Sequence, residues 1–180
     1  MVKHIIDKEL ELRLLDNCDR DELFALIDSN RPHLKQWLPW VDGTKNTDDL
    51  KGFIDSTKQQ YINNNGFQAS IWYKGKIVGV IGFHNVNWSH KSTSIGYWLG
   101  KEFEGKGIMT RACTSLVDYA FKELKLNRVE IRCAENNHKS RAIPERLGFK
   151  NEGTLRECEW LYDHFVSHIA YGMLKGEWKL

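Results

Sequence analysis

The segment FEGKGIMTRAC, residues 103–113, holds the residue types most directly suited to chemistry. Gly105 and Gly107 stand one residue apart, immediately before a run with helical periodicity, and Lys106 places a positive charge between them. The first turn of a helix has unpaired backbone N–H groups at the positive end of the helix dipole, so a loop without side chains lets a phosphate approach them. Thr110 adds a hydroxyl donor in that turn. The spacing predicts a phosphate-binding loop, with a plain glycine turn as the alternative.

Two common phosphate loops do not fit this segment. The Walker pattern G-x-x-x-x-G-K-[ST] is absent from the chain. A dinucleotide-binding fingerprint needs glycine or alanine at position 110, where this chain has threonine, and it normally follows the first strand of a βαβ unit. Both kinds of nucleotide-binding protein are therefore disfavoured.

The composition indicates one globular domain that spans residues 1–180. Apolar residues make up 41% of the chain and charged residues 28%, which is ordinary for such a protein. The formal net charge is only +2, so the chain lacks the positive excess that drives binding to a nucleic-acid backbone. The start, MVKHIIDKELELRLL, mixes charges with apolar residues and resembles neither a signal peptide nor a membrane span. We expect a cytoplasmic protein that binds neither nucleic acid nor membrane.

Hydrophobic periodicity alternates between helix and strand along the chain, which is typical of a mixed α/β layer fold. The most regular helix starts at Ile108, and its apolar residues recur every four positions as far as Leu124. Strands are predicted at LELRLL, FQASIWY, KIVGVIGF, STSIGYWLG, RVEIRCA and HFVSHIAYGML. Helices are predicted at DRDELFALI with a cap at Asp19, from a cap at Thr47 to a stop at residues 63–66, and at SRAIPERLGF. Pro144 inside the last helix predicts that this helix is short.

The cysteines and histidines do not predict a metal or redox site. Cys18, Cys113, Cys133 and Cys158 include no C-x-x-C pair, and the seven histidines include no pair at metal-ligand spacing in a helix. Cys113 and Cys133 fall on apolar positions of periodic elements, so we predict that both are buried thiols. No metal is expected.

With its neighbours, the glycine loop resembles the central motif of the GNAT N-acetyltransferases. In that family a strand, a Q/R-x-x-G-x-G/A loop and a helix bind the pyrophosphate of acetyl-CoA, and the matching segment here is STSIGYWLGKEFEGKGIMTRA. Glu104 stands where the family usually has glutamine or arginine, and Met109 stands at its last small position. The resemblance implies the GNAT fold, a central and mostly antiparallel sheet flanked by helices.

The resemblance also implies acetyl-CoA as the cosubstrate and identifies its contacts. The loop and first helical turn, Gly105, Lys106, Gly107, Ile108, Met109 and Thr110, are expected to hold the pyrophosphate. The strand residues Tyr97, Trp98 and Leu99 are expected to splay from the neighbouring strand and offer backbone groups to the pantetheine arm and the reacting carbonyl. The segment NNHKSRAIPERLGF resembles the later N-x-x-S motif, which implies that Asn137 lies beside the thioester end.

Two catalytic residues follow from the same resemblance. Many family members use a tyrosine as the acid that protonates the thiolate, and Pro144 occupies that position here. Ser140, the serine of N-x-x-S, is then the candidate donor, with a first-turn capping role as the alternative. Glu159 corresponds to an acidic residue of the RimL-type pattern and is the candidate base, with a solvated loop carboxylate as the alternative.

The chain resembles the RimJ/RimL type within this superfamily, which acetylates protein N-termini, including those of ribosomal proteins. The resemblance rests on HLKQWLPW, IGYWLG and LRECEWLYDHFVSHIAYGML. It implies direct transfer to an α-amino group in a ternary complex, and Trp37 and Trp40 are candidates for a wall of the acceptor pocket. A small amine such as a polyamine or antibiotic remains an alternative acceptor, with Asp42, Asp48 and Asp49 as a source of acidic charge. A catalytically silent acyl-CoA-binding module and a homo-oligomer paired through the C-terminal strand also remain open.

Overall fold

The structure is a computed structural model that describes residues 3–179. Its strands are β1 (Lys3–Ile5), β2 (Leu10–Leu14), β3 (Phe67–Tyr73), β4 (Lys76–Asn87), β5 (Ser92–Leu99), β6 (Arg128–Ala134), β7 (Lys150–Leu161) and β8 (His164–Leu174). Its helices are α1 (Arg20–Ser29), α2 (Arg31–Leu34), α3 (Thr47–Ile62), α4 (Ile108–Lys122) and α5 (His138–Arg146). Short 3-10 helices cover Asn17–Asp19, Val41–Gly43 and Lys101–Phe103.

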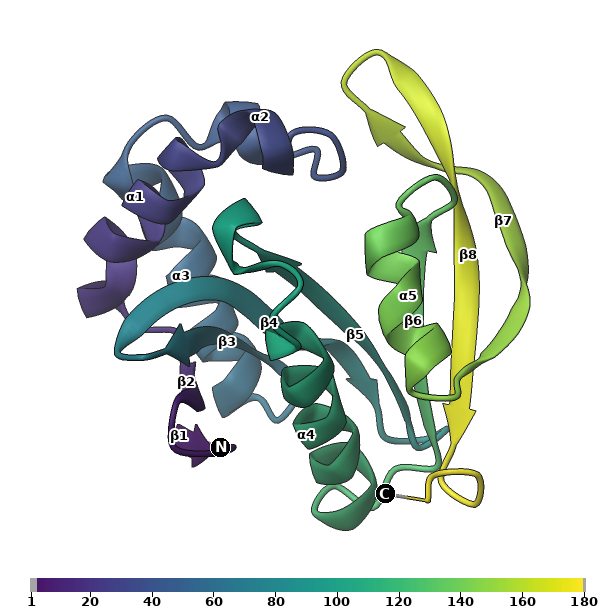
Figure 1. Cartoon of the computed structure of the whole chain (residues 1–180). Coiled ribbons are helices and arrows are strands. Elements are labelled where there is room, and N and C mark those ends of the chain that lie inside the picture. The colour runs from purple at the N-terminus through teal and green to yellow at the C-terminus, as the bar shows by residue number, and fades with distance from the viewer. Residues whose placement is uncertain (1–2, 180) are drawn as a thin grey trace.

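The strands form one curved sheet in the order β1-β2-β3-β4-β5-β6-β8-β7. Every neighbouring pair is antiparallel except β5 and β6, which are parallel. Helix α4 connects these two strands, as a crossover between parallel strands requires. Figure 1 shows α4 and α5 on the near side of the sheet and α1 and α3 on the other side. The predicted mixed α/β fold with a mostly antiparallel sheet is therefore confirmed.

Buried side chains form two cores, one on each face of the sheet. The first core lies under α4, whose residues Ala112, Cys113 and Leu116 are fully buried against the strands. The second lies under α1 and α3 and includes Leu23 and Ile54. Helix α4 needs its broad apolar stripe because it covers the centre of the sheet.

The structure corrects several predicted element boundaries. Strand β7 was not predicted, because almost all its side chains are exposed and show no alternation of apolar and polar residues. Strand β1 is also outside the prediction, since it has only three residues. Asn46, rather than Thr47, caps α3 and accepts hydrogen bonds from two backbone N–H groups of its first turn. Helix α4 ends at Lys122, two residues before the predicted Leu124.

Two further details concern capping and Pro144. The Asp19 side chain makes no capping bond to α1; it accepts instead from the backbone N–H of Asp16 at 3.1 Å. Pro144 lies inside α5, which has nine residues and ends at Arg146, so the prediction of a short helix is confirmed. Among the helices of residues 3–179, none is long and apolar enough to cross a membrane.

Candidate active site

The N-terminus of α4 opens from a loop with two left-handed glycines. Gly105 has a φ of 73° and Gly107 a φ of 68°, and a Cβ on either glycine would meet no atom within 4 Å. The left-handed backbone favours glycine here, and the absence of side chains leaves open space in front of the helix. Gly107 caps α4 without any side-chain hydrogen bond. Since Arg111 is the first residue whose N–H bonds back to Gly107, the N–H groups of the preceding turn have no helical acceptor.

Side chains around this loop add polar groups. The Thr110 hydroxyl accepts a hydrogen bond from Nη1 of Arg146 at 2.9 Å, which leaves its own hydrogen free to donate. Ile108 and Met109 are buried in the first core, so only their backbones can face a ligand. The Lys106 ammonium lies 5.3 Å from the ring centre of Phe103, outside the wall of the cleft described next.

A cleft of about 1240 Å³ extends from this helix start between α2, β5 and α5. Most of the residues proposed from the sequence meet in its wall: Trp37, Tyr97, Trp98, Leu99, Gly105, Gly107, Ile108, Met109, Thr110, Asn137 and Ser140. Among the described residues, four cationic side chains line the cleft, Lys101, Arg111, Lys139 and Arg146, against one carboxylate, Glu104. Lys139 is paired with Glu104 and Arg111 with Asp7, so the excess positive charge that favours an anion comes chiefly from Lys101 and Arg146.

One edge of β5 is unpaired where it borders the cleft. The pairing of β5 with β6 ends at Ile95 and Ile131, although both strands continue for several residues. The other edge of β5 stays paired with β4 as far as Leu99. Residues 97–99 thus stay paired with β4, have no pairing with β6, and line the cleft, as the resemblance implied.

The hydroxyl groups of Tyr97 and Ser140 meet inside the cleft. Tyr97 donates to the Ser140 carbonyl oxygen at 2.9 Å, and the Ser140 hydroxyl lies 3.4 Å from that of Tyr97 and 3.2 Å from the Cys133 sulfur. Burial raises the pKa of Tyr97 well above its usual value, and burial also raises the pKa of Cys133. Both groups therefore stay protonated at neutral pH. The Tyr97 hydroxyl was not anticipated from the sequence, because 43 residues separate it from Ser140.

Asn137, not Ser140, caps the start of α5. Capping was the alternative role considered for the Ser140 hydroxyl. Its side-chain oxygen accepts from the backbone N–H of Ser140 at 3.1 Å. The Ser140 hydroxyl is consequently free of capping duty and points to Tyr97 and Cys133. As predicted, Cys113 and Cys133 are both buried.

Glu104 bridges the two sides of the cleft. Its carboxylate lies 3.4 Å from Nε2 of His33 on α2 and 2.5 Å from Nζ of Lys139 on α5. An acidic residue beside the glycine loop would repel a phosphate, but here the Lys139 ammonium offsets its charge. The unusual residue at position 104 is therefore compatible with anion binding.

The two tryptophans lie in the segment that follows α2. Trp37 lines the cleft, and Trp40 is exposed and packs on Trp98 with ring centres 5.9 Å apart. Trp98 in turn packs against the second core. This aromatic contact lies on the side of the sheet opposite to Tyr97, because successive side chains of β5 face opposite sides.

Glu159 lies in strand β7, not in a loop as predicted from the sequence. Its carboxylate is hydrogen-bonded to Nε2 of His168 on β8 at 3.0 Å. Neither residue lines the large cleft. Ile169 is buried in the first core, so alternation places His168 on the opposite face, the face that carries Trp98.

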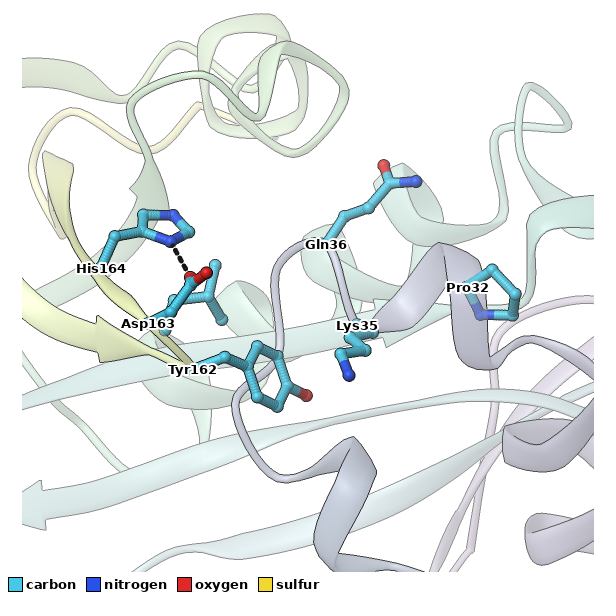
Figure 2. Close-up of a pocket in the computed structure, with 7 residues that line it drawn as sticks. Pro32, Lys35, Gln36, Tyr162, Asp163 and His164 are labelled. Atoms are coloured by element: carbon cyan, nitrogen blue, oxygen red, sulfur yellow. Dashed lines mark hydrogen bonds and ion pairs between the residues drawn. The ribbon is translucent and has the colours of Figure 1, made fainter.

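The turn between β7 and β8 reaches α2 and its following loop. The Tyr162 hydroxyl donates to the Leu38 carbonyl oxygen at 2.7 Å, and the Lys35 ammonium lies 4.6 Å from the Tyr162 ring centre. Figure 2 shows the turn residues 162–164 and, across a pocket of about 390 Å³, the side chains of Pro32 on α2 and of Lys35 and Gln36 just after it. Tyr162 has a φ of 59°, a strained conformation for a bulky residue. This contact joins the β7–β8 turn to α2 and its following loop.

Comparison with known proteins identifies the family. The family model described as "Acetyltransferase (GNAT) domain" matches residues 9–150. The chain belongs to the GNAT acetyltransferases. Within this family it is 41% identical to "Putative ribosomal N-acetyltransferase YdaF" of Bacillus subtilis (strain 168), over 97% of this chain and 96% of that protein. It is 27% identical to the ribosomal-protein-serine acetyltransferase of Escherichia coli (strain K12), over 94% of both chains.

Solved structures of acetyltransferases share the fold. A crystal structure of a microcin C7 self-immunity acetyltransferase, in complex with acetyl-CoA and AMP, superposes with a TM-score of 0.90 at 31% identity, over 94% of each chain. A RimL enzyme bound to coenzyme A superposes with a TM-score of 0.92 at 24% identity, over 96% of this chain and 97% of that one. The chain is therefore a GNAT N-acetyltransferase with ribosomal-protein acetyltransferases among its relatives.

Proposed function

We propose that this protein transfers the acetyl group of acetyl-CoA directly to the N-terminal amine of a protein, with a ribosomal protein as the favoured acceptor. The observation that carries the proposal is the open, glycine-bounded start of α4 at one end of a cationic cleft whose wall is the free edge of β5. The acceptor class is taken from two relatives, one named a putative ribosomal N-acetyltransferase and the other a ribosomal-protein-serine acetyltransferase. Such an enzyme would work in the cytoplasm, where these acceptors are made.

The residues present fit acetyl-CoA. Gly105 and Gly107 leave open space in front of three helical N–H groups, which suits a pyrophosphate. The cationic side chains of the cleft supply long-range attraction for its charge. The loop residues 105–110 would hold the pyrophosphate, the backbone of residues 97–99 would bind the pantetheine arm, and Asn137 would lie near the thioester. When bound, acetyl-CoA supplies an activated acetyl group with a thiolate as the leaving group.

Tyr97 and Ser140 are proposed to return a proton to the leaving sulfur. Both hydroxyl groups are protonated at neutral pH and lie within hydrogen-bond distance of each other. Ser140 would donate, and Tyr97 would hold it in place through the bond to the Ser140 carbonyl oxygen. Free N–H groups on the edge of β5 would stabilise the negative charge that develops on the carbonyl oxygen.

Trp37, Trp40 and Glu159 are proposed to serve the acceptor. The two tryptophans would form an apolar wall, and the Glu159 carboxylate would attract the ammonium group and accept its proton, with His168 holding it in position. Three carboxylates, those of Asp42, Asp48 and Asp49, were the reason to consider a polyamine as the acceptor, and all three have local partners. Asp42 pairs with Lys35, Asp48 pairs with Arg20, and Asp49 closes the cap of α3. These local partners reduce the negative charge available to a polyamine, which favours a peptide acceptor.

The proposal is tested by calorimetric titration with acetyl-CoA, followed by mass spectrometry of acceptors. We expect binding in the micromolar range and acetylation of the N-terminus of a peptide taken from a ribosomal protein. A matched peptide with a blocked N-terminus and a free lysine is the control, and spermidine tests the small-amine alternative. Binding without any product would indicate a silent acyl-CoA-binding module, and no binding would refute the proposal.

A further inference from the structure

His84 lies on β4 where the sheet begins to open. The pairing of β4 with β5 slips between Phe83 and Val86, and His84 is part of this irregularity. Bulges redirect side chains and are common next to active sites. Here the imidazole is turned onto β5, because a Cβ on Gly96 would collide with Nε2 and Cε1 of the His84 ring. The ring thus occupies the space that a side chain at Gly96 would take.

Gly96 is the first residue of β5 beyond its last pair with β6, Ile95 with Ile131. Tyr97 packs on the core under α4, whereas Trp98 packs on the core under α1 and α3. Because side chains alternate along a strand, the side-chain position of Gly96 is on the same face as Trp98. The His84 ring therefore lies at the opening on the face that carries the Trp40–Trp98 contact, opposite to Tyr97 and its partner Ser140.

The His84 ring is free to exchange a proton. Within residues 3–179, no group forms a hydrogen bond or ion pair with the ring. The side chain is exposed, yet surrounding protein lowers its pKa, and desolvation is the only cause. Strands β4 and β5 and helix α3 pack around His84, and Gln60 of α3 donates a hydrogen bond to the His84 carbonyl oxygen. No charged or titratable side chain on these elements contributes to the lowering of the His84 pKa. The imidazole is therefore neutral at pH 7.

We propose that His84 is a further proton acceptor of the transfer reaction and acts on the acceptor amine from the Trp98 face of the opening. The proposal rests on the acetyl transfer proposed above. Nε2 of His84 removes one proton from the acceptor ammonium, and the nitrogen lone pair then forms the C–N bond. The C–S bond breaks and leaves its electron pair on sulfur. The second nitrogen proton ends on that sulfur, through Ser140, and the imidazolium returns its proton to water.

This assignment refines the role given to Glu159 above, so that Glu159 attracts the ammonium group and His84 accepts its proton. Glu159 is already paired with His168, so its carboxylate suits attraction of a cation. The His84 imidazole has no such partner, and a neutral imidazole is a better base than a carboxylate. The two residues come from opposite sides of the opening, β4 and β7.

The test is the pH dependence of kcat/KM for His84→Gln, with His90→Gln as the matched control. His90 is an exposed histidine of the turn between β4 and β5. Because the His84 pKa is lowered, the unaltered enzyme should lose activity only as pH falls through that lowered value, when the imidazole becomes protonated. We expect His84→Gln to lower kcat/KM by about 100-fold and to remove this acid inflection. His90→Gln should match the unaltered enzyme, and both variants should bind acetyl-CoA normally.

A second variant, Gly96→Ala, keeps the imidazole but pushes it away from β5. We expect Gly96→Ala to lower kcat/KM and to bind acetyl-CoA normally. If His84→Gln no longer binds acetyl-CoA, the kcat/KM of Gly96→Ala becomes the test of the role of His84. Unchanged kcat/KM with the acid inflection retained in His84→Gln overturns the role of His84 but leaves acetyl transfer standing. Absence of acetyl transfer by the unaltered protein overturns both proposals.

Discussion

Replacing Gly107 by glutamate tests the phosphate-binding loop most directly. Gly107 has a φ of 68°, and a side chain there would extend into open space in front of α4. A non-glycine residue in the left-handed region costs about 1 to 2 kcal/mol of folding free energy. For a chain of this size that corresponds to a fall in Tm of roughly 2 to 8 °C. The variant should therefore fold, which allows its binding to be measured.

The effect on acetyl-CoA binding should be much larger than this strain suggests. A new carboxylate about 4 Å from a phosphate repels it by about 1 kcal/mol in bulk water and about 4 kcal/mol near a protein surface. Because 1.4 kcal/mol is tenfold in affinity, we expect the Kd to rise by roughly 5-fold to several hundred-fold. Calorimetric titration of the unaltered protein and of Gly107→Glu measures this directly.

Gly75→Glu is the matched control for backbone strain. Gly75 lies in the turn between β3 and β4, has a φ of 78°, and a Cβ there would also meet no atom within 4 Å. The control should lose as much thermal stability as Gly107→Glu and keep normal affinity for acetyl-CoA. Equal affinity of both variants and the unaltered protein would refute the assignment of the loop.

Three further changes test other residues of the proposed site. Glu104→Gln should lower the Kd for acetyl-CoA by roughly 3- to 10-fold, since it removes the only carboxylate among the described residues that line the cleft and releases Lys139. Tyr97→Phe should lower kcat about 10-fold or more with little change in acetyl-CoA affinity, and combining it with Ser140→Ala should add little, because the two hydroxyl groups share one network. Glu159→Gln should raise KM for the acceptor peptide and lower turnover without weakening acetyl-CoA binding.

Each of these changes has an outcome that contradicts the reasoning. Weaker acetyl-CoA binding in Glu104→Gln, compared with a Glu102→Gln control, would mean that the bridge holds the cleft in its binding shape. Fully additive losses in the Tyr97 and Ser140 double variant would separate their roles. An unchanged KM for the acceptor in Glu159→Gln would remove Glu159 from the acceptor site.

The sequence alone determined the elements with strong periodicity and the loop before α4. The four-residue repeat from Ile108 predicts an amphipathic helix, and the glycines at 105 and 107 indicate an unobstructed helix start, because both signals are local in the chain. The motifs around Asn137 and Ser140 also predicted the start of α5. Strand β7 was not predicted from the sequence, because an exposed edge strand needs no alternation of apolar and polar residues and is defined by its pairing with β8.

The tertiary structure decided which side chains meet. Tyr97 reaches Ser140, and Glu104 reaches both His33 and Lys139, across separations of 35 residues or more. The His84 ring lies over Gly96 because the pairing of β4 with β5 is irregular there, and no residue spacing in the sequence predicts this irregularity. Side-chain direction in a sheet depends on register and bulges, which are set by the packing of both faces together. The sequence therefore predicts a phosphate-binding loop, whereas the positions of the proposed proton-transfer groups come only from the folded sheet.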